Sequence, residues 1–260
     1  MTNPHGDYIW YELMTPDPVG AKKFYDDVIG WNIDAEAMPG PTEYRMISTG
    51  DGHVGGVLTL SQDMIDGGAF PTWIGYIGVD DVDAATAVAV ESGATVMMEP
   101  FDIPQGRIAM ITDPQGAPFY IMRGSVEDAS SNAFVGGDEG KIGHCNWNEL
   151  VTTDSAAAIE FYTKNFRWNL PEPMDMGELG KYHFIAVGDE QIGAICGPMP
   201  EMGGAKWNYY FRVPSIDAAV EKVKAGGGTI TQEPMEVPGG GYIIIGNDPQ
   251  GATFCLVGGK

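Results

Sequence analysis

The sequence predicts an α+β protein with two tandem domains, each built of two βαβββ modules. Three observations lead to this prediction: a long internal repeat, the order of strand-like and helix-like segments within each repeat, and a globular composition. Apolar residues make up 43% and charged residues 19% of the 260 residues, a balance typical of folded rather than disordered chains.

The repeat relates the two halves of the chain. IWYELMTPDPVGAKKFYDDVIGWNID aligns with NWNELVTTDSAAAIEFYTKNFRWNLP, and DPQGAPFYIM aligns with DPQGATFCLV. Trp10 and Trp147 are 137 residues apart, and so are Trp31 and Trp168. A long repeat with a nearly constant offset indicates duplicated structural units. We therefore predict domains at residues 1–124 and 140–260, with the Ser-, Gly- and Asp-rich residues 125–139 as a linker.

The first module begins with a strand-like run at residues 8–15. A helix is predicted over residues 17–30, because Asp17 suits the N-cap, Pro18 the first helical position and Gly30 the end. Three strands are predicted to follow at residues 31–38, 44–49 and 53–60, separated by turns that contain Gly or Pro.

The second module repeats this order. Residues 73–80 are predicted to form a strand and residues 81–93 a helix that closes on Gly93. Strands at 94–103, 106–113 and 118–123 complete the module, with the turn DPQG joining the last two.

Charge and cysteine content limit the partners and the location. With 36 acidic and 14 basic residues, the formal net charge is −22, so nucleic acid and anionic membrane surfaces are disfavoured. No segment is apolar enough to cross a membrane, and the N-terminus lacks a signal-peptide pattern. Three scattered cysteines form no disulfide framework and no CxxC pair. We expect a cytoplasmic monomer or homodimer.

The chain resembles the vicinal oxygen chelate (VOC) superfamily in its module order, its FYDDVIGW junction and its DPQGAPFYIM hairpin. This superfamily includes glyoxalase I, extradiol dioxygenases and bleomycin and fosfomycin resistance proteins. The WYEL and WNEL strands are similar to those of tandem glyoxalase-like proteins, a group that includes a mycobacterial antigen. The resemblance implies that each pair of modules curls a mixed sheet into a cup.

Catalytic members of the superfamily hold a divalent metal in this cup through His and Glu. By the resemblance, the ligand positions fall at Trp10, Ile74 and Tyr120 in the first half, and at Trp147, Asn208 and Cys255 in the second. A fourth position falls within HVGGVLTL and EQIGAICGP, which offer no carboxylate at that position. We therefore predict no metal cofactor, while an ion at an atypical site stays open.

Other residues are the candidates for function. Trp10 and Glu12 share one strand face, as do Trp147 and Glu149. If this face lines the cup, both glutamates are desolvated carboxylates and candidate general bases or hydrogen-bond anchors. The predicted ligand-binding residues are Trp10, Tyr76, Tyr120, Trp147, Asn208, Tyr210, Arg212 and Cys255, with Arg212 as a counter-charge in the second half.

A structural interpretation of the same pattern also stands. A glutamate beside a tryptophan can accept the indole N–H, and aromatic residues form cores more often than sites. Three functions therefore stay open: binding of a small apolar or carbonyl-bearing molecule, a glyoxalase-like lyase or hydroxylase-like enzyme with an atypical site, and a non-catalytic scaffold or interaction protein.

Overall fold

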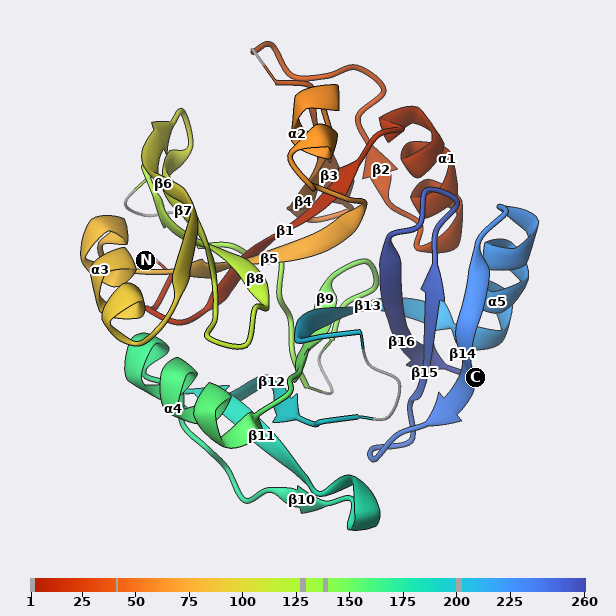
Figure 1. Cartoon of the computed structure of the whole chain (residues 1–260). Coiled ribbons are helices and arrows are strands. Elements are labelled where there is room, and N and C mark those ends of the chain that lie inside the picture. Colours follow the sequence, from red (N-terminus) through yellow and green to blue (C-terminus); the bar gives the residue numbers. More distant parts are fainter. Residues whose placement is uncertain (1–2, 41, 127–129, 138–139, 200–202) are drawn as a thin grey trace. The chain divides into compact units, whose positions relative to one another are not determined.

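In the computed structural model, each half of the sequence forms one eight-stranded mixed sheet within the described part of the chain. The structure describes residues 3–40, 42–126, 130–137, 140–199 and 203–260. The strand orders are β2-β3-β4-β1-β5-β8-β7-β6 and β10-β11-β12-β9-β13-β16-β15-β14, so the second sheet repeats the first (Figure 1). Parallel pairs join the first and last strands of a module, as in β1–β4 and β5–β8, and hairpin neighbours are antiparallel.

The first half contains two modules separated by a short helix. The first module comprises β1 (Tyr8–Thr15), α1 (Pro18–Val28), β2 (Asn32–Ile33), β3 (Tyr44–Thr49) and β4 (Gly52–Thr59), and is followed by α2 (Gln62–Asp66). The second module comprises β5 (Thr72–Gly78), α3 (Val82–Glu91), β6 (Thr95–Ile103), β7 (Gly106–Thr112) and β8 (Pro118–Gly124).

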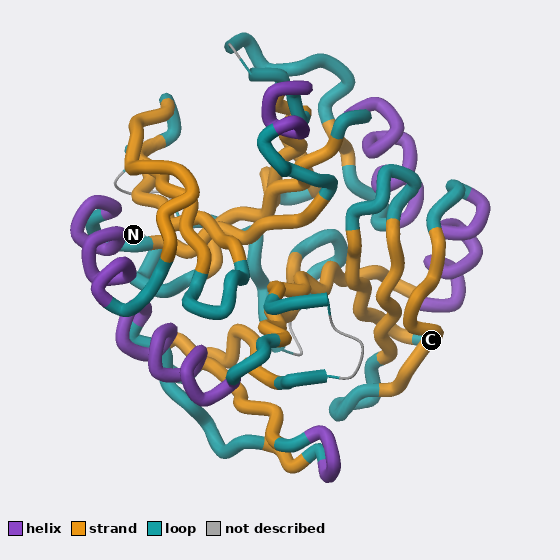
Figure 2. The backbone as a smooth tube through the Cα atoms, in the orientation of Figure 1, coloured by secondary structure: helices purple, strands orange, loops and turns teal. Residues whose placement is uncertain are grey.

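The second half repeats both modules. Its first module comprises β9 (Cys145–Val151), α4 (Ser155–Phe166), β10 (Met174–Asp175), the 3₁₀ turn η1 (Gly177–Leu179), β11 (Lys181–Val187) and β12 (Glu190–Cys196). Its second module comprises β13 (Lys206–Ser215), α5 (Ile216–Ala225), β14 (Thr229–Glu236), β15 (Tyr242–Asn247) and β16 (Thr253–Gly259). Strands form most of the regular backbone in both halves (Figure 2).

Helix caps follow the sequence prediction, whereas one strand does not. Asp17 accepts a hydrogen bond from Gly20 N at 2.8 Å, and Asp154 caps α4 in the same way. The strand predicted at residues 31–38 is reduced to Asn32–Ile33, since only these two residues pair with β3 before a Pro- and Gly-containing segment. Helix α2 was not predicted; Ser61 caps it by accepting from Met64 N.

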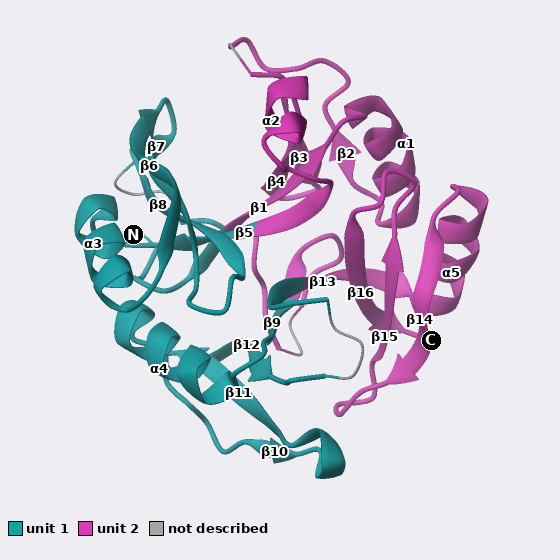
Figure 3. Ribbon diagram, viewed as in Figure 1, with its two compact units in different colours: residues 1–9, 75–131, 147–208 teal, residues 10–74, 132–146, 209–260 magenta. Residues whose placement is uncertain are grey.

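The chain divides into two compact units, and each unit contains segments from both halves of the sequence (Figure 3). Unit 1 contains residues 1–9, 75–131 and 147–208, and unit 2 contains residues 10–74, 132–146 and 209–260. Helices α3 and α4 are neighbours in unit 1, and α1 and α5 are neighbours in unit 2. The domain boundaries at residues 124 and 140 remain a prediction based on the repeat.

Buried hydrogen bonds connect the two sequence halves inside each unit. In unit 2, Tyr25 Oη on α1 donates to Asp248 Oδ2 at 2.9 Å and accepts from Trp73 Nε1 at 3.0 Å. In unit 1, Tyr162 Oη on α4 donates to Asp113 Oδ2 at 3.1 Å and accepts from Trp207 Nε1 at 2.9 Å. Both aspartates belong to DPQG turns, so this repeated motif anchors a helix from the opposite half.

Part of the segment predicted as a linker is held in place. Ser131 Oγ donates to the Ile9 carbonyl at 2.6 Å in unit 1, and Val135 N donates to the Cys145 carbonyl at 2.9 Å in unit 2. Residues 127–129 and 138–139 of the predicted linker lie outside the described residues.

Candidate functional site

Unit 1 contains a hydrogen-bonded chain of three side chains that the sequence prediction only partly identified. Trp147 and Glu149 lie on β9, and Tyr182 lies on β11. Trp147 Nε1 donates to Tyr182 Oη at 2.8 Å, and Tyr182 Oη donates to Glu149 Oε2 at 2.9 Å. The glutamate therefore meets the indole through a tyrosine, and not directly as the structural interpretation of the sequence assumed.

Two further residues complete what we call the Glu149 cluster: Trp147, Glu149, Tyr182, Phe184 and Asn208. Asn208 Nδ2 on β13 donates to the other carboxylate oxygen, Glu149 Oε1, at 3.3 Å. Phe184 meets Trp147 edge-on, with ring centroids 6.0 Å apart. Asn208 is buried, at 6% exposed, whereas Trp147, Glu149, Tyr182 and Phe184 are half-buried. The cluster therefore combines fixed polar atoms with aromatic surface that solvent can reach.

The charge of Glu149 affects neighbouring groups that can ionise. Burial and the nearby Glu149 carboxylate raise the pKa of Tyr182 well above its usual range. The same two causes raise the pKa of Cys196, whose strand β12 pairs with β9. Tyr182 and Cys196 therefore stay protonated at neutral pH, and Tyr182 keeps the hydrogen that it donates to Glu149.

Unit 2 contains a related group, the Glu12 cluster, made of Trp10, Glu12 and Tyr44. Trp10 Nε1 donates to Tyr44 Oη at 2.7 Å, as Trp147 does to Tyr182. Glu12 is opposite Gly56 in the parallel β1–β4 pair, and the Tyr44 ring lies directly over Gly56. The two clusters differ in exposure, because Glu12 is only 3% exposed whereas Glu149 is half-buried.

The remaining predicted aromatic and thiol residues form two strand-paired sets. In unit 1, Tyr76 on β5 and Tyr120 on β8 are register partners, and their buried rings stack with centroids 4.3 Å apart. In unit 2, Tyr210 on β13 is the register partner of Cys255 on β16, and both are buried. The two rings are nearly parallel, with 17° between their planes, and such stacked aromatic pairs are common in protein cores.

Arg212 has a partner that the sequence did not indicate. Its Nη1 donates to the Asn146 side-chain oxygen at 3.2 Å in unit 2. The Arg212 backbone N–H also donates a hydrogen bond to the His144 carbonyl, and the Arg212 carbonyl accepts one from Gly143 N. The structure thus assigns Arg212 a contact with a neutral amide, and its role as a counter-charge remains a prediction.

The residues at the superfamily's metal-ligand positions are a poor donor set for a divalent ion. Trp10 and Ile74 have no metal-binding atom, and Tyr120 stacks on another tyrosine. Within the described residues, no group of three or more His, Cys, Asp or Glu side chains lies close enough to hold a metal ion. The first-half residues at these positions therefore do not fit the usual VOC metal ion, and the absence of a metal cofactor stays a prediction.

Three residues of these clusters were missed by the sequence analysis: Phe184 and the two tyrosines, Tyr44 and Tyr182. The signal for the tyrosines was present, since EYRMIST and KYHFIAV carry a tyrosine at corresponding positions of the repeat, 138 residues apart. Comparison of helices and first strands alone did not reveal it.

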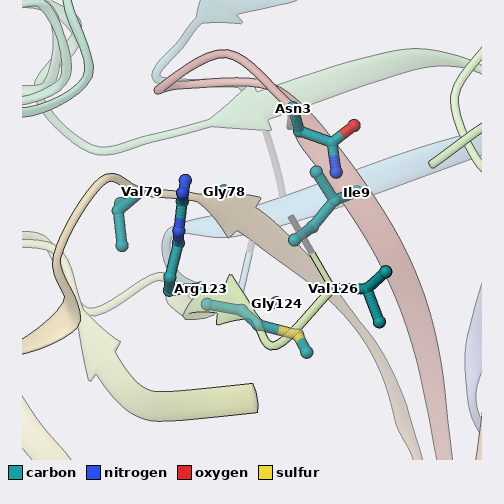
Figure 4. A pocket seen from close by; sticks show the side chains of 8 residues that line it. Asn3, Ile9, Gly78, Val79, Arg123, Gly124 and Val126 are labelled. Carbon is teal, nitrogen blue, oxygen red and sulfur yellow. The ribbon is translucent and has the colours of Figure 1, made fainter. Parts of the chain in front are cut away.

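Unit 1 also contains a small pocket. Its lining consists of Asn3, Ile9, Gly78, Val79, Met122, Arg123, Gly124 and Val126 (Figure 4). None of the residues predicted as a site lines it.

Two eight-stranded mixed sheets, each built of two βαβββ modules, define the class of VOC-fold proteins. A family model described as the Glyoxalase/Bleomycin resistance protein/Dioxygenase superfamily matches residues 8–121 and again residues 141–256. The chain belongs to this superfamily. The resemblance found in the sequence and the predicted α+β fold of tandem two-module domains are both confirmed.

Three comparisons with known proteins cover nearly the whole chain. "Putative glyoxylase CFP32" of Mycobacterium tuberculosis is 33% identical over 251 residues, which span 95% of this chain and 93% of that protein. "Anthracycline biosynthesis protein DnrV" of Streptomyces peucetius is 29% identical over 269 residues, with 95% and 91% covered. The Mn(II)-bound glyoxalase of Novosphingobium aromaticivorans has a TM-score of 0.65 at 16% identity, with 98% and 82% covered. This last likeness concerns the fold alone.

No described helix is long and apolar enough to cross a membrane.

Proposed function

We propose that this protein binds a small apolar or carbonyl-bearing organic molecule on the aromatic strand face around Glu149, without the usual VOC metal. The supporting observation is the Glu149 cluster, in which Tyr182 and Asn208 hold the carboxylate from both sides beside the half-buried rings of Trp147 and Phe184. Small-molecule sites in proteins typically combine aromatic walls with a few fixed polar groups.

Relatives support a role with organic molecules without naming the ligand. One similar protein is named a glyoxylase, and another is named for anthracycline biosynthesis. The Trp–Tyr pairing recurs in both halves, at Trp10–Tyr44 and Trp147–Tyr182. Only the second half adds Asn208 and Phe184, since Ile74 and Met46 stand at the corresponding positions.

A ligand screen tests the binding proposal. Purified protein would be screened by thermal shift against small aromatic, aliphatic and carbonyl compounds, and compounds that raise the melting temperature would then be titrated by calorimetry. We expect binding that weakens at least tenfold in Trp147→Ala, because the variant removes about half of the aromatic contact surface. Trp168→Phe, which changes a core tryptophan of the same unit, is the matched control. If no compound of this size stabilises the protein, the proposal is wrong.

A metal assay tests the metal-free part of the proposal. We expect purified protein to contain far less than one transition metal ion per chain, and ligand binding to be unchanged after treatment with a chelator. One tightly held metal ion per chain, with binding lost on chelation, would contradict this expectation.

A glyoxalase-like lyase or hydroxylase-like enzyme with an atypical site is the second candidate. It is favoured by the Tyr182–Glu149 hydrogen bond, which places a proton donor 2.9 Å from the carboxylate of a half-buried glutamate. Incubation with carbonyl compounds and mass spectrometry of the products would detect turnover. If Glu149 is a general base, Glu149→Gln should lower the rate by about 10²-fold or more at an unchanged melting temperature. Absence of both binding and turnover would leave the scaffold role.

A further inference from the structure

Three hydrogen-bond donors of the Glu149 cluster have their acceptors within the cluster. The indole N–H of Trp147 is donated to Tyr182, and the hydroxyl hydrogen of Tyr182 is donated to Glu149. The Asn208 amide donates to the second carboxylate oxygen, and Asn208 itself is buried. These three donors thus bond within the cluster, and the polar acceptors of the cluster are the carboxylate oxygens of Glu149.

A carboxylate accepts hydrogen bonds and cannot donate them when ionised. Glu149 is half-buried, so the residue is partly exposed to solvent. Its negative charge is already felt by Tyr182 and Cys196, whose pKa values it helps to raise. The chain as a whole carries a formal charge of −22, which adds a field that repels anions.

We infer that the Glu149 cluster selects aromatic molecules that carry a hydrogen-bond donor, either a hydroxyl group or a protonated amine, and rejects aromatic anions. The ring would lie against Trp147 and Phe184, and the donor would point to Glu149. A hydrogen bond to an ionised acceptor is stronger and shorter than one between neutral groups. This inference rests on the proposed function and narrows its ligand class, because a ligand with only a carbonyl group would offer Glu149 no donor.

The inference also predicts one such site in each chain. In the first half, Ile74 replaces the amide donor Asn208, Met46 replaces Phe184, and Glu12 is only 3% exposed. A ligand donor could not reach the Glu12 carboxylate without displacing the residues that cover it.

Four naphthalene compounds of nearly equal size test the inference: 2-naphthol, 2-naphthylmethylamine, 2-methoxynaphthalene and 2-naphthoate. Their binding to the full chain would be measured by calorimetry at pH 7.5. We expect the naphthol and the amine to bind at least tenfold more tightly than the methyl ether, naphthoate to bind most weakly, and the stoichiometry to be one. Equal affinities for the naphthol and the ether, or tightest binding of naphthoate, would overturn the inference while leaving the proposed function intact.

If the proposed function itself is wrong, the result is different, because none of the four compounds would then bind. The variant Glu149→Gln, which keeps the size of the side chain, should abolish the preference for the amine over the ether. Glu160→Gln, at an exposed carboxylate on α4 in the same unit, is the control and should keep the full preference. The comparison of compounds on the unmodified protein decides the inference even if Glu149→Gln does not fold.

Discussion

At the residue scale, the carboxyl group of Asp7 lies in an environment that disfavours its charged form. Burial, together with the nearby Glu190 carboxylate, raises the pKa of Asp7 from its usual 3.8 to about 6. The folded protein therefore binds this proton more tightly than the unfolded chain does. The resulting stabilisation is complete below pH 3.8 and is lost as the pH rises through about 6.

Replacing Asp7 by Asn should remove this pH dependence. We expect the free energy of unfolding of Asp7→Asn, relative to the original protein, to increase by about 1 kcal/mol between pH 5 and pH 8, because solvent partly screens this carboxyl group. Urea unfolding at both pH values measures the difference, and both lie above the isoelectric point of about 4.2. The exposed Glu99→Gln is the control, expected to show no such change. Parallel pH profiles for the original protein and Asp7→Asn would contradict the prediction.

Residue-level prediction succeeded where position on a strand decides orientation. Trp10 with Glu12, and Trp147 with Glu149, were placed on shared faces from the alternation of strand side chains alone. The sequence could not show that Tyr182 stands between Trp147 and Glu149, because the tyrosine comes from another strand more than thirty residues away. Nor could it show that Arg212 would donate to Asn146.

At the scale of elements, helices α1 and α4 are each fixed by one tyrosine. Burial raises the pKa of Asp248 and of Asp113, and the hydroxyl groups of Tyr25 and Tyr162 partly oppose that rise by donating to the carboxylates. Each tyrosine also accepts an indole N–H, so its hydroxyl group satisfies two buried polar groups at once. Loss of either hydroxyl therefore leaves a buried acceptor and a buried donor unsatisfied.

Removing these hydroxyl groups should weaken the two units separately. We expect Tyr25→Phe and Tyr162→Phe each to lower the free energy of unfolding by about 1.5–3 kcal/mol. The double variant should lose the sum, because the two hydrogen-bond sets share no residue. Chemical denaturation measures all three variants. Tyr242→Phe is the control, since its hydroxyl contacts the exposed Glu236 at 3.4 Å and should matter little. An effect of Tyr25→Phe no larger than that of the control would contradict this role.

Element-level prediction depended on local signals. The Asp17 cap helped to identify the first helix, because a cap is a contact within three residues of the chain. The strand predicted at 31–38 was too long, since local composition does not reveal where pairing with β3 stops. Glycines in the fourth strands have a tertiary reason, as a Cβ at Gly55 or Gly193 would collide with the Tyr11 or Asn148 carbonyl oxygen of the paired strand.

At the scale of the whole molecule, the compact units do not follow the repeat. Each unit contains one module from either half, and the Tyr25–Asp248 and Tyr162–Asp113 bonds join these modules. A fragment that ends at the predicted linker would therefore separate each helix from its buried aspartate.

Cutting the chain at the linker tests this organisation. We expect fragments 1–124 and 125–260 to be poorly folded or self-associated when produced alone, and to copurify as a 1:1 complex when produced together. Circular dichroism and light scattering measure the first outcome, and affinity purification of one tagged fragment measures the second. Two stable monomeric fragments, each with a cooperative unfolding transition, would show that the halves are independent.

The sequence by itself determined the duplication, the order of elements in each module and the superfamily, because these features depend on local periodicity, caps and motif spacing. It also predicted, through the family resemblance, that the usual metal ligands are replaced. Only the tertiary structure decided that Tyr44 and Tyr182 join the clusters, that Asn208 contacts Glu149, and that DPQG turns bind helices of the opposite half. Tyr25 and Asp248 are 223 residues apart, and no local pattern encodes which distant segments the folded chain brings together.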